Sequence, residues 1–227
     1  MKHSASVELP VSPATPRQAA GLLGTAMAIV LASGVAPLDR ADWWVENVLP
    51  LALLLTLAAT LRYWRFSRQA YLAIVVMLAI HELGAHFTYA KVPYDAWLYA
   101  LTDHSLNTWM GWHRNQFDRL VHLSYGLLFA LPIRELLQRQ AMLRGLWLAL
   151  CTVSFVLATS ALYKLLEWIG GQYLGDDRAQ AFLATQQDPW DAQKDMALAL
   201  LGALVTLIHA TLGKKKGLPT AARAFHN

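Results

Sequence analysis

Residues Ala70 to Ala90 read AYLAIVVMLAIHELGAHFTYA, an apolar run that two histidines and a glutamate interrupt near its end. The length fits a membrane-spanning helix, because about 20 apolar residues cross the hydrocarbon core of a bilayer. Ionisable side chains lose their hydration inside hydrocarbon, so those found there usually face the interior of a helical bundle and serve a function. The run therefore predicts a transmembrane helix, with His81, Glu82 and His86 as candidate functional residues.

The composition of the whole chain agrees with a membrane protein. Of the 227 residues, 56% are hydrophobic and 15% are charged, whereas soluble domains have about 25% charged residues. Six helices of about 20 residues would use about half of the chain, so we expect one domain, an all-α polytopic membrane bundle. The single cysteine, Cys151, lies in an apolar run, which excludes an intramolecular disulfide and a thiolate metal site.

The apolar runs predict about six transmembrane helices in a single domain, residues 18–212. The predicted spans cover about residues 18–35, 48–64, 70–90, 118–138, 146–170 and 191–212. Residues 1–17 form a polar tail that we expect to be disordered, and residues 213–227 form a basic tail. Residues 91–117 are too polar to span, and their tryptophans and tyrosines suit a segment that lies in the headgroup region.

The distribution of lysine and arginine sets the predicted orientation. With the N-terminus inside, 12 of the 19 basic residues fall on the cytoplasmic side, where short loops of membrane proteins collect positive charge. We therefore expect an N-in/C-in, multi-pass protein of the bacterial inner membrane. The net charge of +4 follows from this bias, so it does not indicate nucleic-acid binding.

This topology brings ionisable residues from four helices to the outer side. Alternate spans run in opposite directions, so the end of one span and the start of the next lie at the same depth, counted at 1.5 Å per residue. We expect an outward-facing pocket with Tyr89, Tyr94 and Trp190 at its rim. Its predicted members are His81, Glu82, His86, Asp118, His122, Glu167, Asp191 and Asp195.

Each member of this set also has a purely structural explanation. Asp118 and Asp191 stand where helices begin and could cap them. Glu167 could serve only to neutralise Lys164, three residues before it on the same helix. A single buried histidine is commonly a hydrogen-bonded core residue. The convergence of all these groups at one depth nevertheless favours a site.

The residue types indicate what such a site could do. As catalytic residues we predict Glu82, Asp118, His122, Glu167, Asp191 and Asp195. Histidines with carboxylates and no cysteine also suit zinc or a similar divalent metal, and the candidate ligands are His81, His86, His122 and Asp191. The spacing His-Glu-x-x-x-His is one residue longer than the metalloprotease motif, so its two imidazoles do not share a helix face and the protease interpretation is excluded.

Four blocks of the sequence carry a family resemblance. They are HELGAHFTYAKVPYD (81–95), NQFDRLVHLSYGLLFALPIRELL (115–137), ALYKLLEWIGG (161–171) and FLATQQDPWDAQKDMALALLGA (182–203). In sequence and order they resemble the YjdF family of bacterial inner-membrane proteins, whose function is unknown. Lys164 departs from the family pattern, in which the resemblance leads us to expect a carboxylate nearby. It lowers the negative charge of the predicted site and argues against a multi-metal centre.

A more distant similarity is to VanZ-like membrane proteins, which are associated with glycopeptide-antibiotic resistance. Those proteins have an Asp-Lys/Arg-x-x-His block, then a helix with a glutamate, then an Asp-rich start to the last helix. The residues that match this order are Asp118, Arg119, His122, Glu167, Asp191 and Asp195.

The depth of the predicted pocket indicates its function. Polar headgroups, water and acyl chains meet at the outer interface, so we expect the protein to bind or modify a lipid or a lipid-linked envelope molecule. A zinc-dependent membrane hydrolase is an alternative, because zinc activates bound water. A small-solute transporter would need a polar path to the inner side, where the sequence offers only Thr206 and His209. A non-catalytic binding or assembly protein is the remaining alternative.

Overall fold

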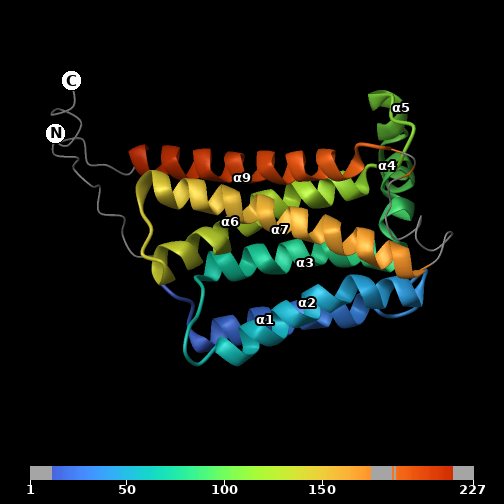
Figure 1. Cartoon of the computed structure of the whole chain (residues 1–227). Coiled ribbons are helices and arrows are strands. Elements are labelled where there is room, and N and C mark those ends of the chain that lie inside the picture. The colour runs from blue at the N-terminus through green and yellow to red at the C-terminus, as the bar shows by residue number, and fades with distance from the viewer. Residues whose placement is uncertain (1–11, 175–185, 187, 217–227) are drawn as a thin grey trace, which may run out of the picture.

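The computed structural model describes residues 12–174, 186 and 188–216, and the regular structure of these residues is entirely helical. Six long helices run side by side, and the short α4 and α5 lie across one end of the bundle (Figure 1). The predicted all-α bundle is confirmed. The elements are α1 (Pro16–Ser33), α2 (Arg40–Thr60), α3 (Arg68–Phe87), η1 (Tyr89–Lys91), α4 (Tyr94–Thr102), α5 (Leu106–Met110), α6 (Phe117–Gln140), α7 (Gly145–Leu174) and α9 (Asp191–Lys216).

Five of the described helices are long and apolar enough to cross a bilayer, namely α2, α3, α6, α7 and α9. Helix α1 has 18 residues, or about 27 Å of length, and its first turn contains Arg17 and Gln18. It packs along α3 inside the same bundle (Figure 1). The bundle is therefore consistent with the predicted number of about six spans.

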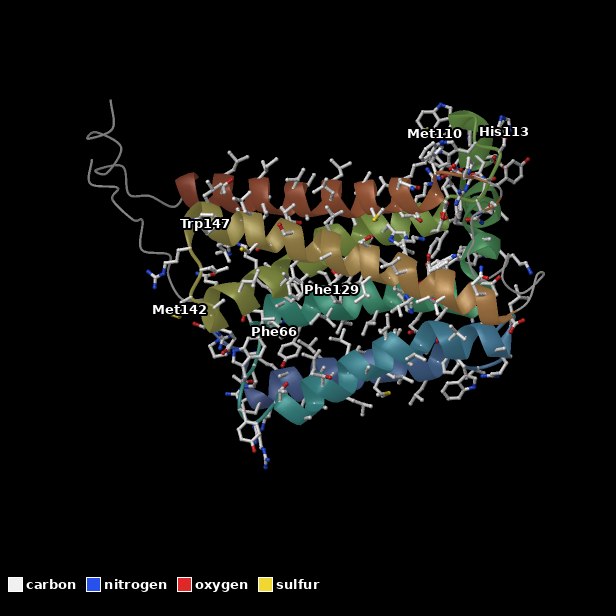
Figure 2. The ribbon with its side chains drawn as sticks, viewed as in Figure 1. Phe66, Met110, His113, Phe129, Met142 and Trp147 are labelled. Atoms are coloured by element: carbon white, nitrogen blue, oxygen red, sulfur yellow. The ribbon has the colours of Figure 1, made fainter. Side chains whose placement is uncertain are left out.

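Apolar side chains cover the outside of the long helices. Leu55, Leu150 and Ile208 are 66%, 48% and 57% exposed, and many similar side chains project outward in Figure 2. Phe129, in contrast, lies between helices, where it packs against buried core residues (Figure 2). An apolar surface of this extent is unusual in water, but hydrocarbon solvates it, as expected of a bundle inside a bilayer.

Helices α6 and α9 pack with their backbones in contact. A Cβ atom on Gly126 would lie 2.0 Å from the carbonyl oxygen of Ala199, and one on Gly202 would lie 2.4 Å from that of Leu123. Only glycine fits at these two points, and such small residues allow the close approach of helices in membranes. This contact holds α6 and α9 side by side.

The end of the bundle where α3 ends and α6 begins is called the outer end below, because the basic residues predict that it faces outward. The aromatic segment between α3 and α6 folds over it. Asn115 Nδ2 donates a hydrogen bond to the carbonyl oxygen of Val92 (2.8 Å). The backbone N–H of Asn107 (3.0 Å) and the hydroxyl of Ser105 (2.8 Å) donate to Asp95, and these bonds lower the pKa of that carboxyl.

Helix α2 begins well before the start of the apolar run that we used to predict it. We expected a span from about Val48, whereas the helix begins at Arg40. Asp39 caps this start, because its side chain accepts a hydrogen bond from the backbone N–H of Asp42 (3.0 Å). The physical reason is that Asp42 and Glu46 are buried, on the face of α2 that points into the bundle. The early start adds Glu46 to the residues at the outer end.

Candidate functional site

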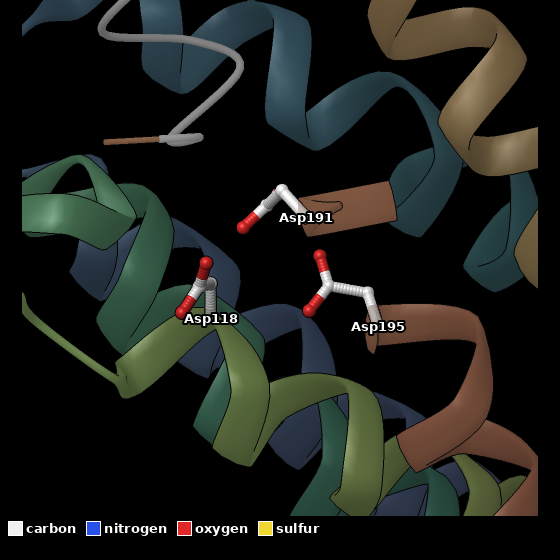
Figure 3. Close-up of side chains that lie close together, drawn as sticks. All are labelled: Asp118, Asp191 and Asp195. Atoms are coloured by element: carbon white, nitrogen blue, oxygen red, sulfur yellow. The ribbon is translucent and has the colours of Figure 1, made fainter. Parts of the chain in front are cut away.

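A group of ionisable side chains gathers where α6 and α9 begin and α7 ends. Asp118 lies in the first turn of α6, and Asp191 and Asp195 project toward it from the start of α9 (Figure 3). Lys164 of α7 lies among them, with its Nζ 2.8 Å from Asp195 Oδ2 and 3.8 Å from Asp191 Oδ2. The same Nζ is 2.8 Å from Oε2 of Glu167, so the predicted Lys164–Glu167 pair forms within this larger group.

His122 joins this group one turn below Asp118. Its Nε2 is 3.4 Å from Asp195 Oδ2, and its ring meets the edge of the Tyr163 ring at 6.3 Å between centroids. The structure thus brings together five of the eight predicted pocket residues. We call these five the carboxylate cluster: Asp118, His122, Glu167, Asp191 and Asp195.

Two arginines that we did not predict as site residues lie over the cluster on its outer side. Arg114 contacts Asp118 and places its Nη1 2.7 Å from Asp191 Oδ1. Arg119 Nη2 is 2.6 Å from Asp188 Oδ2. The i,i+4 spacing of Arg114 and Asp118 was the available signal for this contact, but the sequence does not show that Arg114, before the start of α6, reaches α9.

Asp188 ties the outer layer of this site to the loop before α9. Its Oδ2 accepts a hydrogen bond from Lys194 Nζ (2.6 Å), and its Oδ1 accepts one from the backbone N–H of Trp190 (3.0 Å). These bonds, with the Lys194 contact foremost, lower the pKa of the Asp188 carboxyl. Asp188 therefore remains ionised opposite Arg119 at neutral pH. Trp190, a predicted rim residue, is 63% exposed.

A cavity of about 300 Å³ lies beneath this layer, between α2, α3, α6 and α7. Its size is at the lower end of the range for small-molecule sites. Charged side chains and His122 line the part near the outer end, together with Leu166. The deeper part is lined by Leu49 and Met77 and by three uncharged polar side chains, Tyr125, Thr159 and Ser160. The lining residues are Glu46, Leu49, Met77, His81, Tyr89, Asp118, Val121, His122, Tyr125, Thr159, Ser160, Leu162, Tyr163, Lys164, Leu166 and Glu167.

Hydrogen bonds link four of the elements that line this cavity, namely α2, α3, η1 and α7. The hydroxyl of Tyr163 on α7 donates to Glu46 Oε2 on α2 (2.7 Å). His81 Nε2 is 3.3 Å from the backbone carbonyl oxygen of Glu46, and its Nδ1 is 2.5 Å from the hydroxyl of Tyr89. A carbonyl oxygen only accepts, so Nε2 carries the proton and Nδ1 accepts from Tyr89. The phenol hydroxyl of Tyr89 supplies the proton of this hydrogen bond.

Glu82 and His86 lie away from the cavity, on the side of α3 that faces α1 and α2. Ser33 at the end of α1 donates from its hydroxyl to Glu82 Oε2 and accepts a hydrogen bond from Trp43 Nε1 (2.9 Å). His86 Nδ1 is 2.8 Å from the backbone carbonyl oxygen of Ser33. The structure therefore does not bring these two predicted residues to the carboxylate cluster.

The residues present suit a divalent metal only in part. Asp118, Asp191 and Asp195 offer carboxylate oxygens within 4.8 Å of one another (Figure 3), and oxygen ligands suit hard cations such as Mg²⁺ or Ca²⁺. However, Lys164 and Arg114 already form ion pairs with these three carboxylates. A metal ion would therefore have to displace existing ion pairs.

The predicted zinc ligands are not gathered into one coordination group. Among the described residues, the group whose ligand atoms lie close enough to hold a metal contains no histidine. His81 uses both ring nitrogens in hydrogen bonds, and His86 contacts Ser33 on the other side of α3. The two histidines of α3 are separated because residues at i and i+5 of a helix point in different directions.

These observations define a multi-pass α-helical membrane protein with a cavity and an ion-pair network at one end of its bundle. Residues 19–216 match the family described as predicted membrane protein, DUF2238, and the chain belongs to this family. It is 36% identical over 181 residues to the inner membrane protein YjdF of Escherichia coli strain K12, which covers 79% of this chain and 82% of that protein. No solved structure matches the chain.

The comparison confirms the predicted resemblance to the YjdF family and the location in the bacterial inner membrane. The more distant similarity to VanZ-like proteins stays a prediction.

Proposed function

We propose that the protein binds or modifies an amphipathic molecule of the inner membrane, a lipid or a lipid-linked envelope molecule. The observation that carries this proposal is the division of the cavity. Lys164, Glu167 and His122 line it near the outer end, whereas no charged side chain of the described residues lines the deeper part. Leu49 and Met77 lie there, and the hydroxyls of Tyr125 and Thr159 are paired with each other at 2.6 Å. An amphipathic ligand fits this order, with its polar head beside the carboxylate cluster and its apolar part among the aliphatic side chains.

The charges of the cluster favour a polar head that exchanges ion pairs with the protein. Lys164 lies within 2.8 Å of both Glu167 and Asp195, and its side chain is only 9% exposed. A phosphate that entered the cavity could replace one carboxylate as the partner of Lys164, because its oxygens accept strong charge-assisted hydrogen bonds. The carboxylate released in this exchange could accept a hydrogen bond from an amine or hydroxyl of the head, or act as a general base toward it.

A second candidate is a metal-dependent membrane hydrolase, and it rests on the three carboxylates of Asp118, Asp191 and Asp195. In this case substrate binding would have to draw Lys164 or Arg114 away before a metal ion entered. Purified protein should then retain metal only when a lipid substrate is present. An Asp195→Asn variant should lose that metal. Wild-type protein that retains none with lipid would exclude this candidate.

The proposed function predicts which residues a photoreactive lipid labels. A phospholipid that carries a photoreactive diazirine in its acyl chain, incorporated with the protein into nanodiscs, should label peptides from the cavity wall at Met77, Val121 or Tyr125. The lining of the cavity is the physical reason. Mass spectrometry of digested protein locates the label. Labelling restricted to lipid-facing residues such as Leu55 and Ile208 would contradict the proposal.

A further inference from the structure

The wall between the cavity and the aqueous phase is held by several ion pairs. Asp118 lines the cavity and is buried, and Arg114 above it also pairs with Asp191. Arg119 adds its contact with Asp188 at 2.6 Å. Opening the cavity on this side would separate α6 from α9 and break these partly buried pairs together, which is costly because each leaves a charge without its partner.

The wall between α2 and α7 is much weaker. Leu49, Leu162 and Leu166 line the cavity, and yet they are 45%, 55% and 43% exposed. One layer of leucine side chains therefore separates the cavity from the surrounding lipid. Helix α2 packs on α1 and α3, whereas α7 packs on α6 and α9. In the described part of the chain, the hydrogen bond from Tyr163 to Glu46 joins the two helices at this opening.

Moving these leucines aside costs little inside a bilayer. A leucine that leaves its neighbours there is transferred from protein to hydrocarbon, which solvates it equally well, so no hydrophobic force holds two such helices together. What resists separation of α2 and α7 at this level is the polar contact between Tyr163 and Glu46, since Glu46 is 5% exposed and would otherwise lack this partner.

We propose that the ligand enters the cavity laterally from the bilayer, between α2 and α7, and that the Tyr163–Glu46 hydrogen bond holds this opening closed. This inference rests on the proposed function, because it takes the cavity as the ligand site. It narrows the class of ligand to molecules that are dissolved in the membrane and carry a hydrocarbon tail. Water-soluble solutes that arrive from the outer side do not belong to this class.

A crosslink across the opening tests this route. In a Cys151→Ala background, Glu46→Cys and Tyr163→Cys can be joined by a short bis-maleimide, and N-ethylmaleimide on the same two cysteines gives an unlinked control of similar bulk. The probe is the diazirine phospholipid, added from vesicles, and the readout is the rate at which cavity peptides acquire label. Because Glu46 and Tyr163 both line the cavity, the control with N-ethylmaleimide should take up lipid more slowly than wild type but measurably, whereas the crosslink should abolish uptake. Equal uptake in both would overturn lateral loading.

A single substitution tests the role of the Tyr163–Glu46 hydrogen bond without introduced cysteines. Tyr163→Phe keeps the ring and removes the hydroxyl. Because Tyr163 also lines the cavity, the label of each protein is normalised to its own final amount, and we expect the rate constant of lipid uptake to rise several-fold. An unchanged or slower rate would show that this hydrogen bond does not hold the opening closed.

The final amount of label on the cavity peptides of wild-type protein distinguishes the proposed function from lateral loading. If wild-type protein shows cavity label at long times but uptake is insensitive to both changes, the proposed function survives and lateral loading fails. If it shows none, both fail.

Discussion

Replacing Lys164 with methionine lowers the free energy of unfolding by about 3–5 kcal/mol, because removal of one partner from a buried ion pair leaves an uncompensated charge. Lys164 Nζ is 2.8 Å from Glu167 and 2.8 Å from Asp195, whose side chain has no exposed surface. Methionine has a similar length and no charge, so the change removes the ion pairs with little change in packing. Unfolding in mixed detergent micelles, followed by circular dichroism, measures the difference.

Lys194 provides the matched control for this variant. It also forms an ion pair, at 2.6 Å from Asp188, but its side chain is 47% exposed, and exposed pairs are worth about 0–1 kcal/mol. Lys194→Met should therefore have a small effect. Adding Asp195→Asn to Lys164→Met should restore part of the lost stability, because it removes one of the two stranded charges. Equal destabilisation by Lys164→Met and Lys194→Met would contradict the buried network.

The second large effect concerns the contact between α6 and α9. Gly126→Ala places a methyl group where the carbonyl oxygen of Ala199 lies 2.0 Å away, so the two helices must move apart. We expect a loss of about 3 kcal/mol, at the upper end of the usual cost of overpacking. The same movement would separate Asp118 on α6 from Asp191 on α9, so the variant should also retain less lipid. Stability is measured in the unfolding assay, and bound lipid is measured by native mass spectrometry.

Gly24→Ala is the matched control on α1, where a Cβ atom would meet no neighbouring atom within 4 Å. There the added methyl should be neutral or should stabilise the helix by up to about 1 kcal/mol, the usual difference in helix propensity. If both alanine variants unfold at the same denaturant concentration, the close approach of α6 and α9 does not contribute to the stability of the bundle.

The depth of the ionisable residues inside the predicted spans could be predicted from the sequence, but their direction around the helix could not. Asp118, Glu167 and Asp191 meet because successive spans reverse direction, so the start of one helix lies level with the end of another. His81 and Glu82 are adjacent in the sequence, yet about 100° apart around α3. They therefore face different neighbours, His81 the cavity and Glu82 the hydroxyl of Ser33.

The contributions of α2 and of the segment before α6 were missed for related physical reasons. Glu46 precedes the apolar run of its helix, so a reading based on hydropathy places it in a loop, whereas the structure buries it opposite Tyr163. Arg114 lies outside any predicted span, and its contact with Asp191 joins residues that are far apart in the sequence. Such a contact depends on the close packing of α6 against α9.

The measurement that tests the central claim most directly is the retention of lipid by a variant with a filled cavity. Val121 lines the cavity and is 6% exposed, whereas its neighbour Leu120 is 50% exposed and does not line it. Native mass spectrometry of protein released from nanodiscs should show a retained lipid in wild type and in Leu120→Trp. Val121→Trp should reduce its occupancy at least about tenfold, which is about 1.4 kcal/mol of binding free energy. Equal retention by the two tryptophan variants, or no retained lipid in wild type, would contradict a lipid site in this cavity.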